Sequence, residues 1–192
     1  MAETTPAKEK AAAKKTPAPK QPATPRKPPR AKVVEEAARR YFDALSARDP
    51  DAIVACWHPG GVDDIVPLGV FRGPQEIRSM FTGLFEAFPD LETRVTRVVA
   101  DRDRAAVEWR MEGTFNGAPF QGIKPTGKRA DLRGLDCLEV DEEGRITQNT
   151  GYYDGAAFAR NIGMLPPQDS AAEKAMTVGF NAVTKLRARV GR

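Results

Sequence analysis

One carboxylate stands out in the stretch ADLRGLDCLEV, residues 130–140, which alternates like a β-strand. The alternation places Asp136 in an apolar row that also holds Leu138. An ionised carboxyl over an apolar core is costly unless it has a partner, and burial can raise its pKa until it becomes neutral. The sequence therefore predicts a buried acid with a chemical role, or a strand that turns Leu135 and Cys137 inward instead.

Helical patterns come first along the chain, and strand patterns follow. Apolar residues three and four positions apart predict helices over 33–48 and 73–88, and Asp49 with Pro50 predicts the start of a short helix between them. Residues 58–69 read as a loop or short strand. Strands are predicted over 91–100, 104–115, 118–123, 130–140 and 145–154, and a closing helix over 170–189. This order predicts an α+β domain with helices on one face of an antiparallel sheet.

The first 32 residues differ in composition from the rest. They contain no aromatic residue and carry a net charge of +7. Since the net charge of the whole chain is +4, residues 33–192 carry −3. Such a segment cannot bury enough apolar surface to order itself, so residues 1–32 are predicted to be a disordered basic tail. Weak, non-specific contact with polyanions, or a purely solubilising role, fits this tail. Residues 33–167 then form the domain and 168–192 a helical extension.

The sequence offers little material for a cofactor. Cys56 and Cys137 lack metal-ligand spacing, His58 is the single histidine, and no glycine-rich phosphate loop occurs. We therefore expect neither a metal nor a cofactor. No stretch has the apolar length of a signal peptide core or a membrane span, which predicts a cytoplasmic protein without membrane contact.

Several stretches, among them RRYFDALSARDPDAIVACW, FEAFPDLETRV, PTGKRADLRG and GRITQNTGYYDGAAFARNIGMLP, resemble SnoaL-like polyketide cyclases and ester cyclases of the nuclear transport factor 2-like superfamily. The resemblance covers about residues 33–167. It implies a cone in which helices wrap a curved antiparallel sheet around an apolar pocket, often as a homodimer formed through the sheet. This fold hosts isomerases, cyclases, epoxide hydrolases and non-catalytic binders, so it does not settle function.

Ketosteroid isomerases share this fold, and three of their positions match residues here. Tyr41 matches a tyrosine of the first helix, Asp64 an aspartate after the second helix, with Asp63 as a rival, and Asp136 an aspartate of a late strand. The match implies that Asp64 moves a proton next to a carbonyl, while Tyr41 and a neutral Asp136 donate hydrogen bonds to the enolate. Taken singly, Tyr41 also fits a core aromatic and Asp64 a turn residue.

Limonene-epoxide hydrolases suggest another set. Arg110 and Glu112 have the arginine–acid spacing of those enzymes, but the second acid falls on Gly151 unless Asp154 replaces it. SnoaL-like cyclases use an acid to deprotonate an activated carbon, and both Asp136 and Asp154 fit that description. Seven residues are expected either to line the pocket or simply to pack in the core: Trp57, His58, Phe81, Phe85, Trp109, Phe115 and Tyr153.

These residues predict a cofactor-free isomerase or cyclase that acts on a small apolar carbonyl compound. A non-catalytic module that binds an apolar ligand is the alternative from another class, and an epoxide hydrolase that uses Arg110 and Glu112 is a third.

Removal of residues 1–31 should leave the melting temperature within a few degrees of that of the full chain, because this segment has almost no apolar surface to contribute. Thermal unfolding of both chains by circular dichroism measures the difference. A large loss of stability on truncation would mean that the tail packs on the domain.

Overall fold

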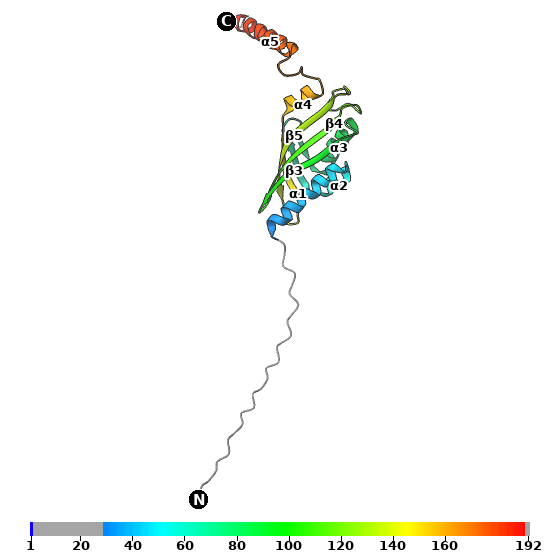
Figure 1. Cartoon of the computed structure of the whole chain (residues 1–192), viewed down its shortest axis with the longest axis vertical. Helices are drawn as coiled ribbons and strands as arrows, with labels where there is room; N and C mark the ends of the chain where they lie inside the picture. Colours follow the sequence, from blue (N-terminus) through cyan, green and yellow to red (C-terminus); the bar gives the residue numbers. More distant parts are fainter. Residues whose placement is uncertain (2–28, 191–192) are drawn as a thin grey trace.

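A six-stranded sheet curves around helices in the computed structural model, which describes residue 1 and residues 29–190 (Figure 1). The predicted disordered tail lies almost wholly outside the described residues. The elements are α1 (Arg30–Ser46), α2 (Pro50–Ala55), β1 (Trp57–Ile65), β2 (Gly69–Arg72), α3 (Gly73–Ala87), β3 (Glu92–Asp101), β4 (Arg104–Thr114), β5 (Arg129–Val140), β6 (Ile146–Tyr153), α4 (Gly155–Asn161) and α5 (Ala171–Val190). The predicted α+β class and cone-like architecture are confirmed.

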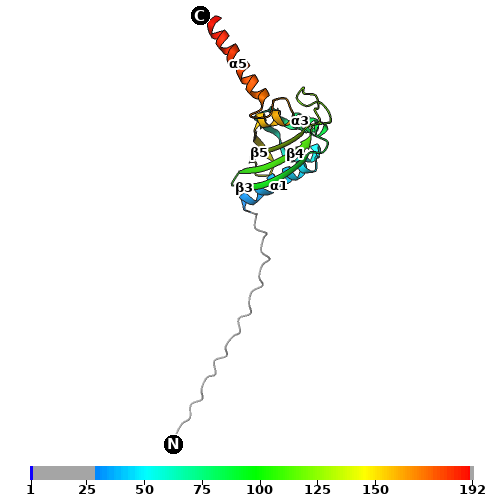
Figure 2. The same ribbon diagram turned by 45° about the horizontal axis from the view of Figure 1, so that its top comes forward.

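The strand order in the sheet is β2-β1-β6-β5-β4-β3. Neighbouring strands are antiparallel except β1 and β6, which run parallel. The long strands β4 and β5 pair over eleven positions and form a large part of the curved surface that faces the helices (Figure 2). Inner and outer positions alternate along β5, where Ala130, Leu132, Asp136, Leu138 and Val140 are buried. Of the two phases that the sequence allowed for this strand, the structure has the one that buries Asp136.

The first two helices form where the sequence predicted them. The apolar stripe of α1, Val34, Ala38, Tyr41 and Leu45, is buried against the sheet. Asp49 caps α2, since its carboxylate oxygen Oδ1 accepts hydrogen bonds from the backbone N–H groups of Asp51 and Ala52, both at 3.0 Å. These helices and α3 close the concave side of the sheet.

Two segments differ from their predicted structure. Residues 118–123 form a turn with one isolated bridge between Phe120 and Ile123, because Pro119 lacks a backbone N–H and Gly122 adopts a positive φ of 76°. Residues 58–69, predicted as a loop or short strand, belong mainly to the nine-residue strand β1. The sheet therefore gains a strand at its β1 side and loses one between β4 and β5.

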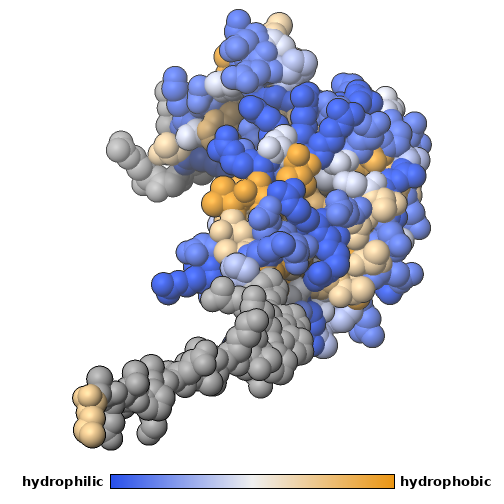
Figure 3. Space-filling model, turned by 60° about the horizontal axis from the view of Figure 1, so that its bottom comes forward, coloured by the Kyte–Doolittle hydropathy of each residue, from blue (hydrophilic) through white to orange (hydrophobic). Residues whose placement is uncertain are grey.

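Helix α5 extends away from the sheet and carries exposed apolar side chains, among them Phe180 and Leu186 (Figures 1 and 2). Ser170 caps it, since its hydroxyl accepts a hydrogen bond from the Glu173 backbone N–H at 3.2 Å, and the Glu173 carboxylate accepts one from the Asp169 backbone N–H at 2.6 Å. Glu173 also pairs with Arg160 of α4. The face shown in Figure 3 is largely hydrophilic, and its most hydrophobic residues gather in one area left of its centre. No helix among the described residues has the length and apolar character needed to cross a bilayer.

Gly117 joins the loop after β4 to the end of α3. Its backbone N–H donates to the carbonyl of Ala87 at 3.1 Å, and the next N–H, of Ala118, donates to the carbonyl of Glu86 at 2.9 Å. These bonds satisfy carbonyl groups that the last turn of a helix leaves free. A Cβ on Gly117 would overlap the carbonyl of Glu86.

Gly117→Ala should therefore lower the free energy of unfolding by on the order of 1–3 kcal/mol, because either the loop or the helix end must move. Gly83→Ala is the matched control, since a Cβ at that position in α3 meets nothing within 4 Å. It should raise stability by about 0.5–1 kcal/mol through the higher helix propensity of alanine. Urea denaturation measures both, and equal stability of the Gly117→Ala variant would contradict the packing.

Candidate functional site

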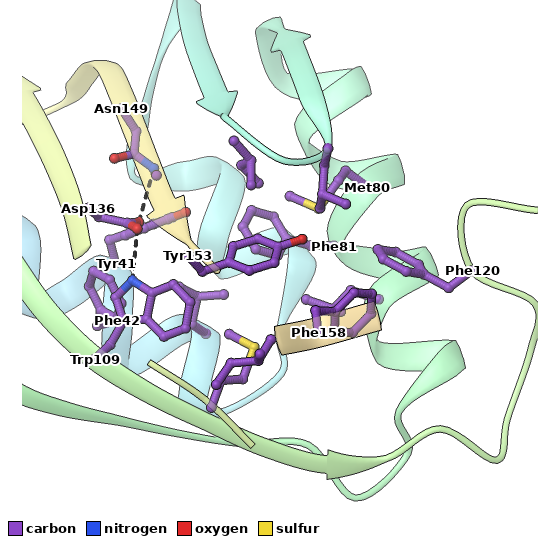
Figure 4. A pocket seen from close by; sticks show the side chains of 17 residues that line it. Tyr41, Phe42, Met80, Phe81, Trp109, Phe120, Asp136, Asn149, Tyr153 and Phe158 are labelled. Atoms are coloured by element: carbon purple, nitrogen blue, oxygen red, sulfur yellow. Dashed lines mark hydrogen bonds between the residues drawn. The ribbon is translucent and has the colours of Figure 1, made fainter. Parts of the chain in front are cut away.

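A cavity of about 80 Å³ lies between the inner face of the sheet and helices α1, α3 and α4 (Figure 4). Its wall is largely apolar. It is lined by Tyr41, Phe42, Leu45, Ile65, Leu68, Met80, Phe81, Leu84, Trp109, Met111, Phe120, Leu132, Asp136, Asn149, Gly151, Tyr153 and Phe158. Among the residues that line the cavity, Asp136 alone has a carboxyl group, so the cavity presents a single acid to an apolar space.

Two glycines make room for that carboxyl group. Gly151 of β6 lies directly opposite Asp136 in the sheet, and a Cβ there would lie 3.2 Å from the Oδ1 oxygen of Asp136. Gly134 lies opposite Trp109 of β4, whose indole ring covers it so closely that a Cβ would overlap the ring. The absence of a side chain at Gly134 lets the indole lie across the inner face and reach Asp136, and its absence at Gly151 leaves room for the carboxyl group beside Asn149.

Asp136 is held by two N–H donors. The indole Nε1 of Trp109 donates to Oδ1 at 2.8 Å, and the amide Nδ2 of Asn149 donates to Oδ2 at 3.0 Å. The same Nδ2 donates to Oδ1 of Asp63 at 2.9 Å, so one amide bridges two buried carboxyl groups. Figure 4 shows the bonds to Trp109 and Asn149 converging on Asp136 at one side of the cavity. Both oxygens accept hydrogen bonds, and these bonds by themselves favour the ionised form of Asp136.

Burial has the opposite effect to these donors on the pKa of Asp136. It raises the pKa of Asp136 to about 6, while the hydrogen bonds from Trp109 and Asn149 limit the rise. Burial and the nearby charge of Asp136 raise the pKa of Asp63 to about 7. The acid in the cavity wall is therefore ionised at slightly alkaline pH, and the acid behind it holds its proton more tightly.

Two tyrosines supply hydroxyl groups at the cavity. Burial first, and then the negative charges of Asp63 and Asp136, raise the pKa of Tyr41 well above its ordinary value. Burial raises the pKa of Tyr153 to about 12. Both phenols therefore keep their protons at neutral pH and are available as hydrogen-bond donors to a ligand.

The three residues matched to ketosteroid isomerase are only partly brought together. Tyr41 and Asp136 both line the cavity. Asp64 is half-exposed and does not line it, whereas its rival Asp63 is fully buried and bonded to Asn149. Alternation along β1 explains the difference, because neighbouring residues of a strand point to opposite faces and Asp63 is the one that points inward. Asp64 is therefore not part of the cavity wall, and Asp63 is the aspartate of β1 that lies next to Asp136 through Asn149.

The epoxide hydrolase set lies outside the cavity. Arg110 neighbours Trp109 on β4 and so points to the outer face, where it pairs with Asp131 and Glu112. Asp154 instead caps α4, since its Oδ1 accepts a hydrogen bond from the backbone N–H of Ala157 at 2.9 Å. Arg110 and Asp154 do share a polar depression on the outer surface, but neither reaches the apolar cavity.

Three of the aromatic residues predicted for the pocket line it: Phe81, Trp109 and Tyr153. The others, Trp57, His58, Phe85 and Phe115, do not. Phe115 stacks on Phe88 in a separate apolar cluster, and Phe85 borders a surface depression on the far side of α3.

Asn149 is the functional residue that the sequence reasoning missed. The polar run ITQNTGYY gave no apolar row to mark its inner face. Two signals were present, since period-two spacing puts Asn149, Gly151 and Tyr153 on one face, and the glycine allows close approach of another side chain. Within residues 29–190, no group of three histidine, cysteine or acidic side chains is placed to hold a metal ion.

The shifted pKa of Asp63 has a measurable consequence. In the folded protein this pKa is about 7 instead of the ordinary 3.8, so between these values the folded state holds a proton that the unfolded state has released. The free energy of unfolding should fall as the pH rises from about 4 to about 7, with at most about 4 kcal/mol from this residue. Asp63→Asn should flatten the decline in a urea denaturation series. Asp64→Asn should reduce the decline only slightly, because the charge of Asp64 is the smallest of the causes that raise the pKa of Asp63. An undiminished decline in Asp63→Asn would contradict the assignment.

Comparison with solved structures shows the same fold in proteins of low sequence identity. A structure from Jannaschia sp. CCS1, assigned as a SnoaL-like polyketide cyclase, is 23% identical over 74% of this chain and 100% of its own, with a TM-score of 0.65. AclR from Streptomyces galilaeus, assigned as a hydroxylase, is 22% identical over 84% of this chain and 96% of its own, with a TM-score of 0.63. A Catenulispora acidiphila protein with a ketosteroid isomerase-like fold, in complex with trimethylamine, is 17% identical over 69% of this chain and 98% of its own, with a TM-score of 0.57.

Sequence comparison identifies the family. No curated protein matches the sequence significantly. Residues 38–149, more than half of the chain, match the family model of the SnoaL-like domain. This segment contains Tyr41, Asp136 and Asn149 and so spans the polar side of the cavity. The chain belongs to the SnoaL-like family.

Proposed function

We propose that the cavity binds a small carbonyl compound and that Asp136 removes a proton from the carbon next to the carbonyl group. The reaction class is a cofactor-free isomerisation or cyclisation that passes through an enolate. The observation that carries this proposal is the position of Asp136, a buried carboxyl group in an apolar wall with both oxygens fixed by N–H donors.

The properties of Asp136 suit a base. A pKa of about 6 leaves the carboxylate ionised at pH 7 to 8, yet makes it a stronger proton acceptor than an ordinary aspartate. Trp109 and Asn149 fix its orientation without supplying it a proton, because indole and amide N–H groups do not ionise in this range. This role replaces the neutral donor that the sequence comparison implied for Asp136.

The charge that develops on the carbonyl oxygen needs donors. Tyr41 and Tyr153 line the cavity and keep their hydroxyl protons, so each is able to donate a hydrogen bond to an enolate oxygen. In a cavity that is otherwise apolar, such a bond is stronger than it would be in water. The proposal thus assigns the base to the sheet and one donor, Tyr41, to α1.

Asp63 supports this arrangement from behind the cavity. It shares the Asn149 amide with Asp136, and its protonation state sets how much negative charge lies next to the base. Below the Asp63 pKa of about 7, Asp63 holds its proton and a single negative charge is buried at the site. Ionisation of both acids would place two charges around one amide group, which low-dielectric surroundings disfavour.

Loss of the base should be visible in the exchange of α-hydrogens of a simple cyclic ketone with D₂O, followed by NMR. Asp136→Asn should slow enzyme-dependent exchange by roughly 10²–10⁴-fold, the usual contribution of a general base. Tyr41→Phe should slow it by roughly 10²–10³-fold, the scale of one lost oxyanion donor. Asp64→Asn is the control, because this side chain does not line the cavity, and it should exchange like the parent.

Two results would count against the proposal. Exchange as fast in Asp136→Asn as in the parent would remove Asp136 from the chemistry. Binding of the ketone by the parent, seen by calorimetry, with no exchange above the buffer rate would leave a ligand-binding module without catalysis.

A further inference from the structure

The cavity has a neighbour on the surface that shares part of its wall. This outer groove is bordered by Pro67, Leu68, Gln121, Ile123, Phe158 and Met164, together with residues of α4. Leu68, Tyr153 and Phe158 line both the cavity and the outer groove. All three are half-buried, as expected for side chains that separate an internal space from an external one.

A row of aromatic rings leads from the acid to this wall. The ring centroids of Trp109 and Tyr153 lie 6.5 Å apart, and those of Tyr153 and Phe158 lie 6.1 Å apart. Trp109 is also the donor to Asp136. The row therefore starts at the carboxylate and ends at the outer groove, and it offers flat apolar faces along the whole distance.

The sizes of the two spaces set the length of ligand that fits. The cavity volume is about 80 Å³, where one water molecule needs about 10–15 Å³ by the same measure. It therefore holds a small head group but not a long molecule. The outer groove adds about 190 Å³, and most of its bordering side chains are apolar.

The backbone on both sides of the wall is closely packed. A Cβ on Gly155, at the start of α4, would lie 3.2 Å from the Cβ of Pro67, so these two segments are in contact. The backbone N–H of Val66 donates to the carbonyl of Gly151 at 3.0 Å, which ties the segment before Pro67 to β6. A passage between the two spaces would therefore open by rotation of the Leu68 and Phe158 side chains, which takes far less energy than movement of packed backbone.

We propose that the substrate is elongated, with an enolisable carbonyl head against Asp136 and an apolar chain that passes between Leu68, Tyr153 and Phe158 into the outer groove. The inference rests on the proposed function for the position of the head. It adds a second binding region, and with it a substrate class of carbonyl compounds that carry an apolar chain.

A series of β-diketones with methyl, butyl or octyl chains tests the outer groove by isothermal titration calorimetry. Affinity should rise by up to about fourfold for each methylene that enters the groove, the ratio that corresponds to burial of a CH₂ group. Met164→Glu and Ile123→Glu put a charge beside the chain, and should abolish this rise while the methyl compound binds as in the parent. Met164 is 59% exposed, so its replacement leaves the fold intact.

Val66→Glu is the matched control, because Val66 is 53% exposed, precedes Pro67 and does not border the groove. It should keep the full dependence on chain length. Two results would contradict binding of the apolar chain in the outer groove. One is equal affinity of the parent for all three diketones. The other is an affinity that rises with alkyl chain length as much in Met164→Glu and Ile123→Glu as in Val66→Glu. Failure of the proposed function would show separately, as ketone exchange that does not depend on Asp136.

Discussion

The carboxyl group of Asp136 lies on the inner face of a sheet, and the surrounding structure is arranged to tolerate it. Its burial costs free energy that only hydrogen bonds can offset, so two donors must reach it at the same time. Trp109 reaches it because Gly134 leaves space under the indole, and Asn149 reaches it because Gly151 leaves space beside the oxygen. Glycine weakens an ordinary strand, but Gly134 and Gly151 leave the space that the two donors need to reach the carboxyl group.

The curvature of the sheet turns this local arrangement into a site. A flat sheet against α1 and α3 would close completely on apolar side chains. Here β4 and β5 curve away from the helices, and β3 contains an irregularity between Val95 and Arg97 that changes its register with β4. The space that remains is lined mainly by apolar and aromatic side chains, and Trp109, one of the rings, holds the acid at its edge.

The sequence predicted the strand β5 but left its phase open, because Leu135 and Cys137 on one face compete with Leu132 and Leu138 on the other; the structure buries the face that carries Asp136. It predicted the helices well, since Asp49 and the stripe of α1 are strong local signals. It failed on β1, where polar and glycine residues give no apolar row and the register with β6 shifts between Trp57 and Val62. Without that row, the choice between Asp63 and Asp64 depends on tertiary contacts that no local pattern contains.

Arg110 shows a different kind of error. Its spacing to Glu112 is a local pattern, and the pair does form, but on the outer face. The position of Trp109 on the inner face excludes Arg110 from the same cavity by alternation alone. Strand phase is therefore the first constraint on any catalytic set in this fold. Asp136, Asn149 and Trp109 satisfy it from three adjacent strands, β5, β6 and β4. Trp109 lies opposite Gly134 and Asn149 opposite Leu138, so each is a diagonal neighbour of Asp136. Long side chains span the roughly 7–8 Å between diagonal neighbours, so the three converge without help from a loop.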